Sequence, residues 1–87
     1  MPEAFVLLNV ASGFEDEVVK QLRNLEAVQE AHVSYGSFDL ILRIKADTME
    51  QLKNVVSREI RFNGNVLSTL TLIRTDNDRK PSKIIKY

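Results

Sequence analysis

Apolar and polar positions along the chain follow two different periods. Ala4–Val10 is a short run of β-forming residues, and apolar residues at helical spacing follow it at Val18, Val19, Leu22 and Leu25. The first run is too short for a typical helix, whereas the second places its apolar side chains on one stripe of a helix. The pattern therefore predicts a strand over Ala4–Val10 and then a helix.

The start of this helix is predicted from a second pattern. Ser12 and Glu15 have the S-x-x-E spacing of a capping box, in which the two side chains satisfy free N–H groups at a helix start. We therefore expect the helix to begin there, and the apolar stripe ends near Asn24–Glu26.

The middle of the chain returns to a period of two. Val28–Tyr35 alternates in a way that is typical of a half-exposed edge strand, and Asp39–Lys45 continues as a further strand. Between them, Tyr35–Asp39 is a short turn that predicts a hairpin, in which we expect Gly36 to take a positive φ.

The last part of the pattern predicts a second helix and a fourth strand. Asp47 and Glu50 repeat the capping-box spacing and predict a helix from Thr48 to about Ile60, and Val66–Arg74 reads as a fourth strand. This βαββαβ order predicts an α+β, ferredoxin-like fold, an antiparallel sheet with two helices on one face. We assign residues 1–75 to one domain and residues 76–87 to a polar, basic C-terminal tail that either folds back or contacts a partner.

The strands carry more apolar residues than one covered face requires. An uncovered apolar face of several hundred Å² is uncommon on a soluble monomer and usually marks an interface. We therefore expect a homodimer, a dimeric α/β-barrel formed by sheet-to-sheet packing. The alternative is a monomer in which Ile84 and Ile85 cover part of this face. The residues assigned to the dimer interface are Phe5, Leu7, Asn9, Leu40 and Leu42.

Composition removes several classes of function. The 87 residues include no cysteine, and 12 basic residues balance 12 acidic ones. A neutral chain has no field to gather nucleic acid, so direct DNA binding is disfavoured, and no apolar run approaches the roughly 20 residues of a membrane span. His32 is the only histidine, so we predict no metal site, no cofactor and no catalytic residue. The expected location is cytoplasmic, since a chain without thiols fits a reducing compartment.

These elements, taken in order, resemble a known family. The first strand, the Glu-Val-Val helix, the Tyr-Gly-Ser-Phe-Asp turn and the Val-Leu-Ser-Thr-Leu-Thr strand are similar to the RAM domain, the effector-binding domain of Lrp/AsnC (feast/famine) transcription regulators. The likeness covers about Glu3 to Thr75, and its most specific element is the turn Gly36–Asp39 that leads into an apolar strand. The sequence shows no helix-turn-helix before the first strand, as in the stand-alone RAM proteins.

The resemblance implies a non-enzymatic module that binds small effectors, chiefly amino acids. It also implies dimers that assemble further into rings, as octamers or decamers, and that contact full-length Lrp/AsnC regulators. The implied effector-binding residues are Gly36, Ser37, Phe38, Asp39, Ser68, Thr69 and Thr71.

Simple chemistry supports this carry-over. Backbone amides of a glycine turn can hold a carboxylate, Asp39 can hold an ammonium group, and the hydroxyls of strand four can donate or accept. Two departures from the family pattern are Phe38, where tyrosine is common, and Asn65, where glycine is common. Three alternatives stay open: Asp39 only anchors its turn, the chain is a purely structural assembly module, or it is a small dimeric α/β-barrel enzyme.

Overall fold

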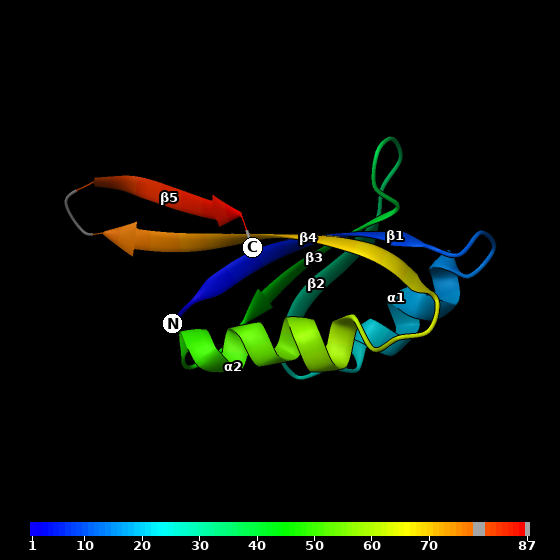
Figure 1. Cartoon of the computed structure of the whole chain (residues 1–87), viewed down its shortest axis with the longest axis horizontal. Helices are drawn as coiled ribbons and strands as arrows, with labels where there is room; N and C mark the ends of the chain where they lie inside the picture. Colours follow the sequence, from blue (N-terminus) through cyan, green and yellow to red (C-terminus); the bar gives the residue numbers. More distant parts are fainter. Residues whose placement is uncertain (78–79, 87) are drawn as a thin grey trace.

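The computed structural model describes residues 1–77 and 80–86, and it shows one antiparallel sheet with helices on one face (Figure 1). The sheet order is β2-β3-β1-β4-β5, so β2 is an edge strand as predicted. The ferredoxin-like fold class is confirmed. The elements are β1 (Glu3–Val10), α1 (Glu15–Arg23), β2 (Val28–Val33), β3 (Leu40–Lys45), α2 (Met49–Asn54), the π-helix η1 (Val55–Ile60), β4 (Val66–Asn77) and β5 (Lys80–Lys86).

The core lies between the sheet and its helices. Every second residue of β1 and β3 is buried there, and α1 and α2 cover these residues with their own apolar stripes. Valine, leucine and isoleucine side chains contribute roughly 1.5–3 kcal/mol each when fully buried, so this layer holds the fold together. The buried set is Ala4, Val6, Leu8, Val10, Val18, Val19, Leu22, Ala31, Leu40, Leu42, Ile44, Leu52, Val56, Ile60 and Ile73.

The first predicted helix start is wrong. The N-terminal cap of α1 is Phe14, which makes no side-chain capping bond, and Ser12 precedes it in a turn. Gly13 has φ +87°, and the Phe14 amide donates to the Ala11 carbonyl at 3.0 Å. Because this tight turn takes up the residues after β1, the helix begins later than the Ser12–Glu15 spacing indicates. Its end at Arg23, with Asn24 as the C-terminal cap, is where the apolar stripe predicted it.

The second helix start is displaced by one residue. Thr48, not Asp47, is the cap, and its hydroxyl accepts a hydrogen bond from the Gln51 amide at 3.1 Å. The Gln51 side chain accepts from the Asp47 amide at 3.2 Å. The predicted end at Ile60 is confirmed, but Val55–Ile60 is wound as a π-helix, which the sequence did not predict.

The register of the sheet decides which residues occupy its open face, the one away from the helices. Phe5 pairs with Arg43 and Leu72, and Leu7 pairs with Ile41 and Leu70, so these side chains share that face. Leu40 and Leu42 are 0% exposed and lie in the core under the helices. Their placement at the dimer interface is therefore wrong, because β3 is one residue out of the assumed phase and Ile41 takes their place.

The C-terminal segment adds a strand that the sequence did not predict. β5 pairs antiparallel with β4, from Leu72↔Lys86 to Asn77↔Lys80, and the hairpin of β4 and β5 extends beyond the helices (Figure 1). The segment therefore folds back beside β4 and widens the sheet. The side chains of Ile84 and Ile85, which were weighed as a cover for the open face, lie outside what the structure describes.

Candidate functional site

The turn between β2 and β3 rises on the open side of the sheet, away from the helices (Figure 1). Gly36 has φ +116°, as predicted, a conformation that side-chain-bearing residues rarely adopt. The Ser34 amide donates to the Asp39 carbonyl at 2.7 Å and closes the base of the turn. Gly36 and Ser37 are exposed and Phe38 is half-buried, so the tip of the turn is open to solvent.

Asp39 ties this turn to the neighbouring strand. Its backbone N–H donates to the Leu8 carbonyl at 2.8 Å, and its carboxylate Oδ2 accepts from the Val10 N–H at 2.9 Å. The carboxylate thus supplies a partner to a main-chain donor at the end of β1, where the register of β1 with β4 shifts. Asp39 has an anchoring role, but it anchors the turn to β1 and not to itself.

The predicted residues of β4 fall on two sides of the sheet. Ser68 pairs with Asn9 on the open face, and its hydroxyl accepts a hydrogen bond from the Asn9 side-chain amide at 3.1 Å. Thr69 and Thr71 pair with Leu8 and Val6, so both face the helices. Thr71 is 1% exposed, and its hydroxyl has no hydrogen-bond partner. A ligand on the open face can reach Ser68 but not Thr71.

The turn Gly36–Asp39 nevertheless lies near Asn9 and Ser68 at the end of β1, and we call this group of residues the polar corner. Leu8 pairs with Leu40 on one side and with Thr69 on the other, so the hairpin turn and the start of β4 flank the same end of β1. Strands two positions apart are separated by about 10 Å, a span that a small ligand can bridge. Asn9 lies between them on the open face. It was assigned only to the dimer interface, yet a lone amide in the otherwise apolar run Ala4–Val10 was a signal for a polar site.

The rest of the open face is apolar at its centre and charged at its other end. The central patch consists of Phe5, Leu7, Ile41, Leu70 and Leu72, all half-buried. Arg43 bonds Glu30 on β2 through Nε and Glu3 on β1 at 3.0 Å, and Glu3 in turn holds Arg74 on β4 at 3.4 Å. This charged row crosses four strands, and pairing between strands far apart in sequence hid it from sequence reasoning.

Electrostatics at the edge strand follow from the charged row. Hydrogen bonds from Arg43 and then from His32 hold the pKa of Glu30 below its ordinary value of 4.5. The bonds to Glu3 and Glu30 raise the pKa of Arg43. His32 is exposed, and its Nε2 lies 3.2 Å from Glu30 Oε1. Within residues 1–77 and 80–86, no group of three or more potential ligands is placed to hold a metal ion.

The sequence matches the family model described as the Lrp/AsnC ligand binding domain over residues 3–80. The regulatory protein AsnC of Haemophilus influenzae is 29% identical over 72 residues, which cover 83% of this chain and 47% of that protein. An uncharacterised HTH-type transcriptional regulator of Pyrococcus furiosus is 30% identical over 73 residues, 80% of this chain and 49% of the regulator. The chain thus spans about half the length of the curated relatives it matches.

Several solved structures share the fold of this chain. The crystal structure of FFRP-DM1 is 37% identical and has a TM-score of 0.82, with 84% of this chain and 97% of that chain covered. A hypothetical protein from Pyrococcus horikoshii is 34% identical at a TM-score of 0.84, with 91% and 95% covered. The structure of Escherichia coli AsnC, at 21% identity and a TM-score of 0.80, shares the fold over 92% of this chain and 54% of its own.

Among the described residues, no helix is long and apolar enough to cross a membrane. The match of a ligand-binding family model to nearly the whole chain agrees with the fold described above. The chain therefore belongs to the Lrp/AsnC ligand-binding domain family.

Proposed function

We propose that the chain is a non-enzymatic sensing module that binds an amino acid at the polar corner and assembles through its open sheet face. The observation that carries the proposal is the family match over residues 3–80, to a domain whose family description is ligand binding. The curated relatives are named as a regulatory protein and as an HTH-type transcriptional regulator, which supports a regulatory role over a catalytic one.

The polar corner has the chemistry that a free amino acid needs. An α-carboxylate requires N–H donors, which the amides around Gly36 and the Asn9 side chain supply. An ammonium group requires acceptors, which the Asp39 carboxylate and the Ser68 hydroxyl supply. Because Thr69 and Thr71 face the helices, the proposed site consists of the turn Gly36–Asp39 together with Asn9 and Ser68.

Assembly through the open face follows from its composition. Phe5, Leu7 and Ile41 form one continuous patch with Leu70 and Leu72, and only a second surface can remove this patch from water. A second copy of the same face satisfies this need with two-fold symmetry. The homodimer is the unit from which octameric or decameric rings would be built, and contact with full-length regulators would carry the signal to DNA.

A ligand screen by thermal unfolding tests the proposal. A compound that binds only the folded state stabilises it by RT ln(1 + [L]/Kd), about 2.7 kcal/mol at a hundredfold excess over Kd. For a domain of this size, that corresponds to a rise in Tm of about 10 °C or more. The screen covers the twenty amino acids, with Ser68→Ala as the variant that should lose the shift and Ser57→Ala, on the exposed side of η1, as its control.

The purely structural assembly module is the second candidate. It is favoured by the Asp39 carboxylate, which already serves the Val10 amide, and by the burial of Thr71. Absence of a thermal shift with all twenty amino acids, in a protein that still forms dimers, would establish that candidate in place of the sensor.

A further inference from the structure

The turn between η1 and β4 contains a sequence to which the proposed function gives no role. It reads Asn63-Gly64-Asn65, in which Asn63 is half-buried and Gly64 is exposed. The Val66 N–H donates to the Asn63 carbonyl at 2.9 Å and closes a turn of four residues. The Ala11 N–H donates to the Asn65 carbonyl at 2.8 Å, so the turn is also tied to the segment that follows β1.

The Asn63 side chain is held at both of its polar atoms. Its Oδ1 accepts a hydrogen bond from the Asn65 N–H at 3.0 Å, which makes an Asx turn, and its Nδ2 donates to Gln21 Oε1 on α1 at 2.6 Å. The Asx turn folds the side chain back over the peptide bond between Asn63 and Gly64, because the donor lies two residues further along the chain. It therefore brings the side-chain carbonyl carbon, Cγ, towards the Gly64 nitrogen.

The Gly64 nitrogen is open to reaction. Among the described residues, the Gly64 N–H donates no hydrogen bond. No side chain shields this nitrogen, and no neighbouring heavy atom lies within 4 Å of the place that a Cβ on Gly64 would occupy. An exposed, unbonded amide next to an asparagine side chain is the arrangement from which an asparagine loses its amide group.

Four other asparagines of the chain lack this arrangement. Each is followed by a branched residue, and the N–H of that residue already donates a hydrogen bond, as Val10 does to the Asp39 carboxylate at 2.9 Å. The four pairs are Asn9-Val10, Asn24-Leu25, Asn54-Val55 and Asn65-Val66. The residue after Asn77 lies outside what the structure describes.

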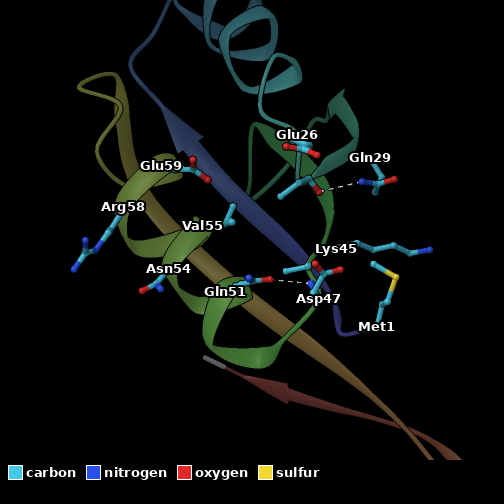
Figure 2. Close-up of a pocket in the computed structure, with 12 residues that line it drawn as sticks. Met1, Glu26, Gln29, Lys45, Asp47, Gln51, Asn54, Val55, Arg58 and Glu59 are labelled. Atoms are coloured by element: carbon cyan, nitrogen blue, oxygen red, sulfur yellow. Dashed lines mark hydrogen bonds between the residues drawn. The ribbon is translucent and has the colours of Figure 1, made fainter.

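Asn54 gives the clearest contrast, because its side chain is more exposed than that of Asn63. It lies at the end of α2, in the wall of a groove of about 830 Å³ that runs between Lys45–Asp47 and the flank of α2 and η1 (Figure 2). The Val55 N–H is bonded to the Gln51 carbonyl within the helix. Helical bonding thus withholds from Asn54 the nitrogen that the turn offers to Asn63.

We infer that Asn63 is a site of spontaneous covalent modification, which deamidates and forms isoaspartate. The Gly64 nitrogen loses its proton to hydroxide and attacks Asn63 Cγ, and the new C–N bond closes a succinimide ring. The bond from Cγ to Nδ2 breaks, and Nδ2 takes a proton from water and leaves as ammonia. The Asn65 N–H stabilises the negative charge that Oδ1 gains during the attack, since it already bonds this atom.

Water then opens the ring at one of its two carbonyl groups. Addition at Cγ restores the original main chain and leaves aspartate. Addition at the main-chain carbonyl of residue 63 gives isoaspartate, in which the main chain runs through Cγ. The net change is one water consumed and one ammonia released, and no oxidant or reductant is involved.

The two products differ in their effect on the turn. Aspartate still accepts from the Asn65 N–H but no longer donates to Gln21. Isoaspartate also displaces the carbonyl that the Val66 N–H bonds, and it lengthens the main chain before β4 by one carbon atom. Loss of the Val66 bond alone should lower the Tm by about 4–8 °C, the shift expected for one hydrogen bond in a domain of this size.

Storage of the intact chain in mildly alkaline buffer, followed by peptide mapping with mass spectrometry, tests the inference. The peptide that contains Asn63 should exchange an amide for a carboxyl group, and a protein-isoaspartate methyltransferase should label the product. Peptides that contain Asn9, Asn24 or Asn54 should keep their amides, because the N–H that follows each of them is already bonded.

Three variants assign the reaction to this turn. Gly64→Ala should slow it about tenfold or more, because a methyl group hinders the approach of the nitrogen and a misplacement of about 1 Å can cost about a hundredfold. The fold accommodates this substitution, since Gly64 has open space around it and no positive φ. Asn63→Ser, which keeps an acceptor for the Asn65 N–H, should abolish the reaction, whereas Asn65→Ser in the same turn should leave its rate unchanged.

Three results would overturn the inference. The first is an intact Asn63 amide after storage that fully converts an unfolded peptide with the sequence of residues 58–68. The second is loss of amide groups from Asn54 or Asn65 at the same rate as from Asn63. The third is an unchanged rate in Gly64→Ala, which would show that the main-chain nitrogen is not the attacking group.

Discussion

The two faces of the sheet are made by the same strands yet end in different states. On the helix side, Ala4, Val6 and Leu8 of β1 are 0% exposed, and the layer is aliphatic throughout apart from threonine at the β4 side. On the open side, the apolar patch is half-buried and lies between the charged row and the polar corner. One face is covered by the chain's own helices, whereas the other is left open and carries polar groups at both ends of its apolar patch.

The largest expected effect comes from Leu42, on the helix side. Leu42→Ala deletes most of a fully buried side chain and leaves a cavity, which should cost about 2–5 kcal/mol of the free energy of unfolding. Its neighbour Ile41, on the open face, provides the matched control. Ile41→Ala should leave the unfolding of the isolated monomer within about 1 kcal/mol, since that side chain is already partly in water. Urea unfolding of both variants measures the difference, and equal losses would contradict the distinction between the faces.

A charge on the open face should break assembly without breaking the fold. Leu7→Lys places an ammonium group in the centre of the proposed dimer interface, where desolvation without a partner costs several kcal/mol. The dimer should dissociate at least about a hundredfold more readily, while the far-ultraviolet circular dichroism of the monomer stays the same. Sedimentation at several protein concentrations measures this. Lys20→Ala on α1 is the control, and an unchanged dimer in Leu7→Lys would remove the open face as the interface.

The charged row should make the free energy of unfolding depend on pH in the acidic range. The pKa of Glu30 is lower in the folded protein than its ordinary value of 4.5, because Arg43 and then His32 bond the ionised form. Ionisation therefore stabilises the fold fully above pH 4.5, and this contribution is lost as the pH falls through the folded pKa. Arg43→Gln should return the pKa of Glu30 towards 4.5 and flatten this part of the pH dependence. A carboxyl NMR titration checks the pKa, and a value for Glu30 that stays equally low in the variant would assign the shift to another group.

The smallest effect is expected at Thr71, the polar residue of the helix side. Its hydroxyl is buried without a hydrogen-bond partner, and replacing such a group by an apolar one of the same shape is neutral or stabilising. Thr71→Val should therefore raise the free energy of unfolding by about 0–1 kcal/mol, whereas Thr71→Ser, which keeps the hydroxyl and deletes a methyl group, should lower it by about 1 kcal/mol. If Thr71→Val is the less stable of the two, the hydroxyl has a partner in solution, and the helix side is less dry than the structure indicates.

The sequence predicted the elements better than the details at their ends. Strands with a period of two and stripes with helical spacing are local patterns, so β1, β2, β3 and both helices were found within a few residues. The positive φ of Gly36 was predictable because a turn of this kind needs it. The predicted helix starts were wrong, although Ser12 and Asp47 have the spacing of capping residues. The tight turn at Gly13 delays the start of α1, and the hydrogen bond from the Gln51 amide to Thr48 makes Thr48 the cap of α2.

The phase of β3 shows why the faces could not be read from the chain alone. Leu40, Ile41 and Leu42 are all large and aliphatic, so alternation does not say which of them points to the helices. Pairing with β1 settles it: Leu40 pairs with Leu8 and Leu42 with Val6, and both partners lie in the core. The proposed site at the polar corner also depends on strand pairing. Asp39 bonds Val10, and Ser68 bonds Asn9, because β1 lies between β3 and β4 in the sheet.

The sequence by itself therefore determined the order of the first four strands and the two helices, the ferredoxin-like class and the excess of apolar strand residues, since each follows from residues close together in the chain. The tertiary structure decided which side chains share a face, how the charged row crosses four strands, and where the polar corner and the groove lie. The physical reason is that strand register is set by contacts between distant segments, and a shift of one residue moves every side chain of a strand to the opposite face.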